Sequence, residues 1–143
     1  MRRVVTCILV TAALTFGAGL LSVPAAAPAL AEGGCIASVS QPNPYTPRSA
    51  SLFGRTIELR YSAVTRCAWG RISNGSAGDS VWLNRKNPDG SGYVDLTGVG
   101  GKAFIGTGSR STYIPTAFND NTKLMRACGK ANDRPDIVCT GWF

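Results

Sequence analysis

Apolar and polar residues alternate along several short runs between residue 55 and the last residue of the chain. In residues 55–63, Ile57, Leu59 and Tyr61 occupy one side of an extended chain, while polar side chains occupy the other. A period of two with one apolar side is typical of a half-buried β-strand. Gly, Asn, Asp, Pro and Ser clusters separate such runs. The pattern predicts an all-β fold, a small antiparallel β-sandwich or barrel of roughly seven or eight short strands, stapled by disulfides.

The run CAWGRIS predicts a second strand that begins at Cys67. In an unbroken strand Cys67 and Trp69 share one side with Arg71, whereas Ile72 falls on the other. Burying Cys67, Trp69 and Ile72 together requires one extra residue. We therefore expect a β-bulge at Gly70, which keeps the cysteine and the tryptophan on the core side and turns Arg71 toward solvent.

A candidate recognition surface follows from the position of Trp82. An Asn-Gly pair at positions 74 and 75 predicts a hairpin turn into a strand over residues 80–84, in which Trp82 points away from its apolar neighbours. In the next strand Tyr93 and Asp95 share the side of Trp82. Because Trp and Tyr are favoured at recognition sites, these three residues predict a site for a sugar or for a partner protein. The alternative is that a two-sheet sandwich buries Trp82 as well.

The cysteines predict a disulfide framework. Cys7 lies near the N-terminus, and Cys35, Cys67, Cys128 and Cys139 remain for the rest of the chain. In the last hairpin, a turn centred between residues 133 and 134 places Cys128 directly opposite Cys139, within disulfide reach. Pairing of Cys35 with Cys67 then follows by elimination. Metal binding is disfavoured because the chain has no histidine and no C-x-x-C spacing.

The first 31 residues have the layout of a secretory signal peptide. Arg2 and Arg3 precede an apolar stretch, and small residues end with A-x-A at Ala31. We expect cleavage after Ala31, a proline-rich N-terminal arm over residues 32–54, and a β domain over residues 55–143. A membrane anchor is the alternative, but no positive charges follow the apolar stretch. We therefore expect a secreted protein with no stable membrane insertion after cleavage.

The chain is basic. It holds 15 Lys and Arg against 8 Asp and Glu, with a formal net charge of +7, and only two of the cations lie in the expected signal peptide. For an exported protein this charge suits anionic cell-envelope polymers better than nucleic acid, although solubility alone also explains it. Arg60, Arg66 and Arg71 are expected to form a basic patch near the first two strands, the alternative being scattered, solvated charge.

The composition disfavours the common hydrolytic mechanisms. Serine and cysteine acyl-transfer triads use a base such as histidine, which the chain lacks. Most of the aspartates stand beside Gly, Asn or Pro in apparent turns, where they usually shape the turn. The glycine-rich run GVGGKAFIG lacks the G-K-[ST] of a phosphate-binding loop. We therefore expect no catalytic residues, no cofactor and no metal.

Several short motifs resemble a known family. IELRYS, AWGRI, YIP followed by FND, RACG and CTGWF occur in the same order and at similar spacing in an uncharacterised, YjfA-like family of small secreted proteins from Gram-positive bacteria. In that family the cysteine after LRYS usually comes earlier than Cys67 does here. The resemblance implies a secreted, disulfide-bonded β domain and supplies no activity.

These observations lead to one expected function and two alternatives. We expect a secreted, non-catalytic binding or interaction module that acts at the cell envelope or on another exported protein. A secreted inhibitor of an extracellular hydrolase, inserting the disulfide-closed loop of residues 129–138, is the first alternative. A small cell-wall hydrolase is the second. The sequence leaves the oligomeric state open.

Overall fold

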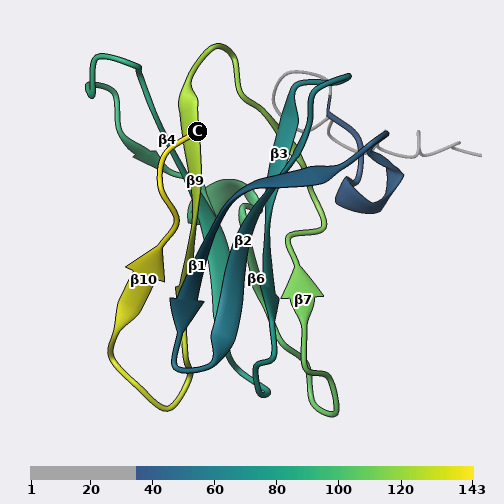
Figure 1. Cartoon of the computed structure of the whole chain (residues 1–143), viewed down its shortest axis with the longest axis vertical. Coiled ribbons are helices and arrows are strands. Elements are labelled where there is room, and N and C mark those ends of the chain that lie inside the picture. The colour runs from purple at the N-terminus through teal and green to yellow at the C-terminus, as the bar shows by residue number, and fades with distance from the viewer. Residues whose placement is uncertain (1–34) are drawn as a thin grey trace, which may run out of the picture.

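A computed structural model describes residues 35–143, and the predicted signal peptide lies outside the described residues (Figure 1). Within residues 35–143 the chain forms ten β-strands and two short 3₁₀ helices. The elements are η1 (Ser38–Ser40), β1 (Tyr45–Leu52), β2 (Arg55–Ser62), β3 (Cys67–Ser73), β4 (Ser80–Lys86), β5 (Val94–Asp95), η2 (Thr97–Val99), β6 (Lys102–Phe104), β7 (Thr112–Tyr113), β8 (Phe118–Asn119), β9 (Leu124–Lys130) and β10 (Ile137–Cys139).

The strands form two antiparallel sheets that pack face to face, so the predicted all-β sandwich is confirmed. Sheet one has the order β1-β2-β3-β7, with β8 also paired to β3. Sheet two has the order β10-β9-β4-β5, with β6 also paired to β4. More strands form than the alternation predicted, because several are only two or three residues long.

The core lies between the two sheets. Ile57 and Leu59 of β2 and Val81 and Leu83 of β4 belong to it, and all four side chains are fully buried. Burying an aliphatic side chain of this size contributes roughly 1.5–3 kcal/mol. The alternation that predicted β2 and β4 therefore identified the inner faces of both sheets.

The β-bulge predicted at Gly70 is wrong. The pairing of β2 with β3 runs without interruption from Thr56↔Ser73 to Ser62↔Cys67. Gly70 instead faces the core, where an added Cβ would lie 2.8 Å from a methyl group of Val81. Glycine is thus needed for the close approach of the two sheets rather than for a change of register. As a result Cys67, Trp69 and Arg71 all lie on the outer face of sheet one. Cys67 and Trp69 are buried as predicted, but on this outer face and not between the two sheets.

The hairpin predicted at residues 74–75 is also wrong, although the chain does turn there. Asn74 has a φ of +57°, in the left-handed region that asparagine tolerates better than most residues. The strands on either side, β3 and β4, belong to different sheets. The turn therefore carries the chain across the sandwich.

The proline-rich arm proves to be part of the β domain. Its second half forms β1, which pairs with β2 along the edge of sheet one, with an irregularity in register between Tyr45 and Arg48. Pro47 lies in that irregular stretch, where the missing amide hydrogen is tolerated at a sheet edge. The expected boundary at residue 55 falls within the β1–β2 hairpin.

Both predicted disulfides are present. Cys128 and Cys139 are paired residues on β9 and β10, as the turn geometry predicted. Cys35 is bonded to Cys67 at the start of β3, which fixes the first described residue to sheet one. Separately, no helix within residues 35–143 has the length and apolar character needed to span a membrane.

Candidate functional site

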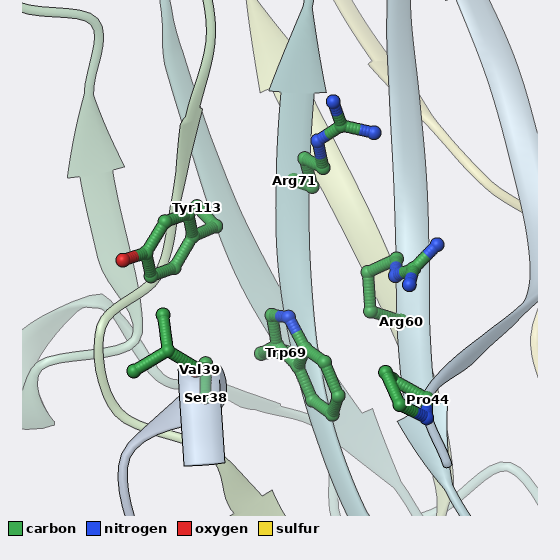
Figure 2. A pocket seen from close by; sticks show the side chains of 7 residues that line it. All are labelled: Ser38, Val39, Pro44, Arg60, Trp69, Arg71 and Tyr113. Carbon is green, nitrogen blue, oxygen red and sulfur yellow. The ribbon is translucent and has the colours of Figure 1, made fainter. Parts of the chain in front are cut away.

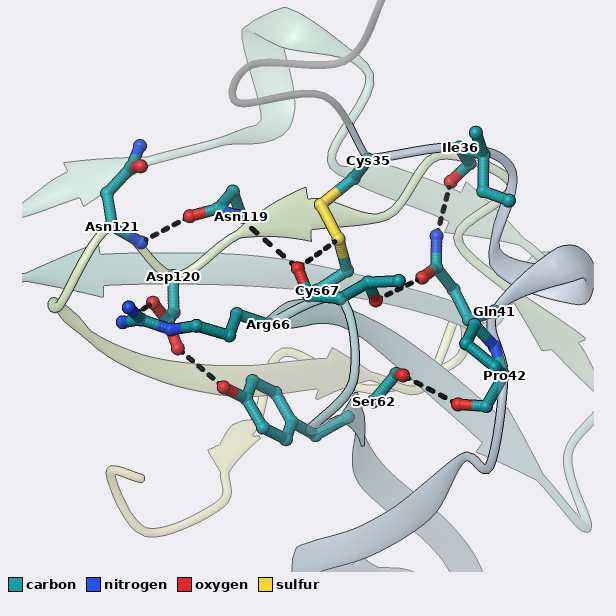
Figure 3. The surroundings of a disulfide bond; sticks show 12 residues. Cys35, Ile36, Gln41, Pro42, Ser62, Arg66, Cys67, Asn119, Asp120 and Asn121 are labelled. Carbon is teal, nitrogen blue, oxygen red and sulfur yellow. Dashed lines mark hydrogen bonds and ion pairs between the residues drawn. A yellow bond between two sulfur atoms is a disulfide. The ribbon is translucent and has the colours of Figure 1, made fainter.

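The N-terminal segment of residues 35–44 folds over the outer face of sheet one. The Cys35–Cys67 disulfide anchors its start, and Ala37 forms an isolated bridge with Thr116. The buried hydroxyl of Ser38 donates a 2.5 Å hydrogen bond to the carbonyl of Ile114. These contacts place the segment against the sheet, and Figure 3 shows the neighbourhood of the disulfide.

The second half of the segment is held by side-chain hydrogen bonds. The amide of Gln41 donates to the carbonyl of Ile36 within the segment, and the hydroxyl of Thr65 donates to the side-chain oxygen of Gln41 (Figure 3). The hydroxyl of Ser62 donates to the carbonyl of Pro42. The covering segment is therefore bonded to the β2–β3 hairpin at both its start and its second half.

A pocket of about 210 Å³ lies where this segment meets the sheet. Figure 2 shows Trp69 at its centre, with Tyr113 on one side and Arg60 on the other. Trp69 is only 5% exposed although it points outward, because the N-terminal segment covers it. The pocket is lined by Ser38, Val39, Pro44, Arg60, Trp69, Arg71 and Tyr113.

Glu58 holds the two arginines of this pocket in place. Arg71 donates to Glu58 at 2.8 Å, and the guanidinium of Arg60 lies 4.0 Å from the same carboxylate. Arg60 also donates to the hydroxyl of Thr46 at 2.7 Å. Each guanidinium carries five N–H donors, so both keep donors beyond those that these contacts use. Paired donors of this kind bind planar carboxylates.

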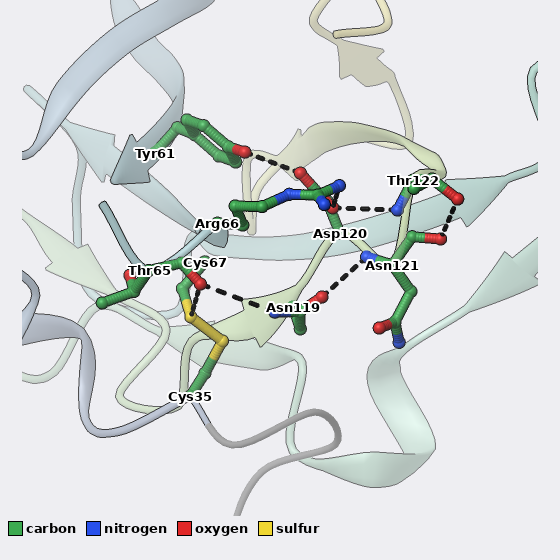
Figure 4. Close-up of polar contacts among 9 residues, drawn as sticks. All are labelled: Cys35, Tyr61, Thr65, Arg66, Cys67, Asn119, Asp120, Asn121 and Thr122. Carbon is green, nitrogen blue, oxygen red and sulfur yellow. Dashed lines mark hydrogen bonds and ion pairs between the residues drawn. A yellow bond between two sulfur atoms is a disulfide. The ribbon is translucent and has the colours of Figure 1, made fainter. Parts of the chain in front are cut away.

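Arg66 belongs to a different cluster, so the three arginines do not form the single basic patch that was predicted. Its guanidinium donates to Asp120 at 2.5 Å, and the hydroxyl of Tyr61 donates to the other oxygen of the same carboxylate at 2.6 Å (Figure 4). The amide of Thr122 also donates to Asp120. The cluster joins the β2–β3 turn to the segment between β8 and β9.

This cluster shifts the pKa values of all three of its charged or ionisable side chains, and the hydrogen bond to Asp120 raises the pKa of Arg66. Burial acts to raise the pKa of Asp120, but hydrogen bonds from Tyr61, Thr122 and Arg66 outweigh it and leave that pKa below its ordinary value. Burial, followed by the hydrogen bond to Asp120, raises the pKa of Tyr61 to about 12. Asp120 therefore stays ionised and Tyr61 neutral at neutral pH.

Asp79 is a further buried carboxylate with a cationic partner. It accepts from Arg55 at 2.9 Å and from the amides of Asn132 and Ser76. Burial acts to raise the pKa of Asp79, yet these hydrogen bonds lower it overall. Since Arg55 begins β2 and Asp79 precedes β4, the pair ties the two sheets together.

The predicted residues Trp82, Tyr93 and Asp95 lie on the outer face of sheet two. Trp82 is only 8% exposed, since it stands opposite Cys128 and Lys102 on the neighbouring strands and the ammonium of Lys102 lies 5.2 Å from its ring centre. Tyr93 is 54% exposed and packs edge-on against Trp142. The prediction of a shared side is consistent with the pairing of β4 and β5, but Trp82 is largely covered.

The outer face of sheet two carries cations and aromatic rings that the sequence reasoning missed. Lys86, Arg126 and Trp142 were not predicted as binding residues, although Lys86 shares the alternation of Trp82 along β4. We call this surface the cationic face and define it by its positively charged and aromatic side chains. They are Lys86, Lys102, Arg126 and Lys130, together with Trp82, Tyr93, Phe104 and Trp142.

Within residues 35–143, no group of three or more Cys, Asp or Glu side chains is placed to hold a metal ion. The chain matches no family model, no curated protein and no solved structure. The resemblance to the YjfA-like family therefore stands on the sequence motifs alone and stays a prediction.

Proposed function

We propose that this chain is a secreted, non-catalytic binding module that acts at the cell envelope or on another exported protein. In this proposal the pocket around Trp69 binds one carboxylate-bearing group of the partner. The observation that supports it best is the position of Arg60 and Arg71, whose guanidinium groups line the same pocket and keep unused donors.

The dimensions of the pocket support a residue-sized ligand group. Pockets for drug-sized molecules usually measure about 300–1,000 Å³, and this pocket measures about 210 Å³. It suits a single sugar unit or a terminal amino acid that belongs to a larger partner. Val39, Pro44 and the edge of Trp69 supply apolar contact, while the arginines supply specificity for the charge.

The state of the carboxylates favours binding over hydrolysis. A glycosidase needs a carboxylic acid whose pKa is raised, so that it can donate a proton near neutral pH. The pKa values of Asp79 and Asp120 are lowered instead. Glu58 lies between the guanidinium groups of Arg60 and Arg71 and serves as their shared partner. The inhibitor alternative stays a prediction.

A fluorescence and NMR titration of the mature protein tests this proposal. The probes are glucuronate and an acetylated dipeptide with a free C-terminal carboxylate, each compared with its neutral amide. We expect the carboxylate forms alone to shift the indole signal of Trp69, and Arg60→Gln with Arg71→Gln to weaken binding at least tenfold, the scale expected when charge-assisted hydrogen bonds are lost.

Two exposed arginines outside the pocket provide the matched control. Arg110→Gln with Arg134→Gln removes the same charge and should leave the titration unchanged. Equal binding of the amide and the carboxylate, or equal loss in both double variants, would show that the pocket does not recognise a carboxylate.

A further inference from the structure

The cationic face gathers four positive side chains on one side of sheet two. Arg126 and Lys130 lie on β9, opposite Asn84 and Ser80 of β4. Lys102 of β6 lies opposite Trp82, and Lys86 ends β4 itself. Residues that stand opposite each other in antiparallel strands share a face, and so do residues two apart along one strand. All four cations therefore project from the same side, away from the core.

These cations lack the carboxylate partners that the arginines of sheet one have. On sheet one, and at the start of β2, Arg55, Arg60, Arg66 and Arg71 each lie within ion-pair distance of a carboxylate of the described residues. The acidic residue nearest in register on the cationic face is Asp95, whose carboxylate accepts the amide hydrogen of Thr97. The positive charge of this face is consequently left available to an external anion.

Aromatic rings hold three of these cations in position. The ring of Trp142 has the ammonium of Lys86 4.6 Å and the guanidinium carbon of Arg126 4.5 Å from its centre. Lys102 lies 4.9 Å from the ring centre of Phe104, in addition to its contact with Trp82. A cation over a ring loses side-chain freedom before any ligand arrives, which lowers the entropic cost of binding an anion.

The four cations form an extended row along the direction of β4. Lys86 is six residues along β4 from Ser80, which Lys130 faces. At about 3.3 Å per residue the cations span on the order of 20 Å along the strand. A single small anion contacts only part of such a row, whereas a linear polymer with repeated charges contacts all of it.

We propose that the cationic face binds a linear, phosphate-rich polymer of the cell envelope. Three of the four cations are lysines, which bind phosphate as compact point charges without requiring planar geometry. The choice of an envelope polymer rests on the export assumed in the proposed function. The surface itself is separate from the Trp69 pocket, because it lies on the other sheet.

Retention on immobilised long-chain inorganic polyphosphate tests this assignment. We compare the mature protein with Lys86→Gln/Arg126→Gln and with the charge-matched control Arg110→Gln/Arg134→Gln, after thermal unfolding has shown that all three fold. The first variant should bind roughly 10- to 30-fold more weakly, since two basic contacts to a polyanion are lost. The slope of log affinity against log salt should fall by roughly 1 to 2. The control should stay within about twofold, within the additive scatter of distant substitutions.

A third variant separates this surface from the proposed pocket. Arg60→Gln/Arg71→Gln should keep full polyphosphate retention, so the failure of one proposal leaves the other standing. Equal losses in the Lys86/Arg126 variant and in the control would reduce the effect to net charge and overturn the assignment. Tighter binding of duplex DNA than of polyphosphate at the same charge would also overturn it.

Discussion

The outer faces of the two sheets use positive charge in opposite ways. On sheet one, Arg60 and Arg71 share Glu58, and a disulfide-anchored segment covers the surface and leaves one small pocket. On sheet two, Lys86 and Arg126 rest on the ring of Trp142, and no carboxylate of residues 35–143 lies within ion-pair distance of them. Charges on the first face are partly compensated by Glu58 and held in a defined shape, while those on the second are not paired with a carboxylate of the described residues.

This difference suits the two faces to different tasks: selective recognition on sheet one and long-range attraction of anions on sheet two. A paired arginine loses part of its long-range attraction but holds a fixed geometry, which suits recognition of one group. An unpaired cation over a ring keeps its long-range field, which draws in any polyanion and weakens with salt. If both proposals hold, one face selects a ligand and the other concentrates the protein where that ligand occurs.

Removing the covering of sheet one is expected to have the largest effect. Cys35→Ala with Cys67→Ala should cost about 4 kcal/mol in the free energy of unfolding, because the bond closes the longer loop. Cys128→Ala with Cys139→Ala should cost about 3 kcal/mol by the same model. Denaturant unfolding measures both. If the second pair costs more than the first, the covering segment contributes little to stability.

Breaking a paired cation should cost more than removing an open one. Asp79→Asn leaves Arg55 without its buried partner, and we expect a loss of about 2–3 kcal/mol, somewhat below a fully buried pair because Arg55 keeps some exposure. Lys102→Gln on the cationic face should change stability by no more than about 0.5 kcal/mol. Thermal unfolding of the two variants side by side checks this. Similar losses in both would remove the distinction between structural and open charge.

Acid should weaken the arginine–carboxylate contacts. The pKa values of Asp79 and Asp120 are lower in the folded chain than the value of about 3.9 expected when it is unfolded. The stability they contribute is therefore present above about pH 4 and is lost as the pH falls further. Unfolding measured from pH 6 to pH 2 should show this loss, and Asp120→Asn should make the profile flatter. Since Arg66 is half exposed, we expect the Asp120 share to be about 1 kcal/mol.

The smallest effect is expected from removing the carboxylate on sheet one, which leaves its arginines without an acidic partner, like the cations of sheet two. Glu58→Gln frees Arg60 and Arg71 and should change stability by less than about 1 kcal/mol. Retention on polyphosphate should rise about two- to threefold, because two cations become available to the polymer. An unchanged retention would mean that the covering segment, rather than Glu58, limits access to these arginines.

Strand positions and the disulfides could be predicted from the sequence because they depend on local order. Alternation defined β2, β3 and β4, and the spacing about the last turn placed Cys128 opposite Cys139. Sheet membership depends on distant contacts. The Asn-Gly turn at residues 74–75 looks the same whether the next strand returns to the same sheet or crosses to the other.

The side on which Trp69 lies could not be predicted, because two distant parts of the chain decide it. Gly70 faces inward since Val81 of the opposite sheet leaves no room for a side chain, and Trp69 is buried by a segment about thirty residues earlier. The cationic face could be predicted in part from the sequence, because Lys86 shares the alternation of Trp82. Trp142 lies beyond the last strand, where no period assigns a side.

The register of β9 with β10 makes the Cys128–Cys139 bond a check on assembly. A slip of one residue between these strands would send the two sulfur atoms to opposite sides of the hairpin, where they cannot meet. Oxidation thus seals the hairpin only after its strands have aligned correctly. Molecules that contain this disulfide therefore have β9 and β10 in the native register, and β9 carries Arg126 and Lys130 of the cationic face.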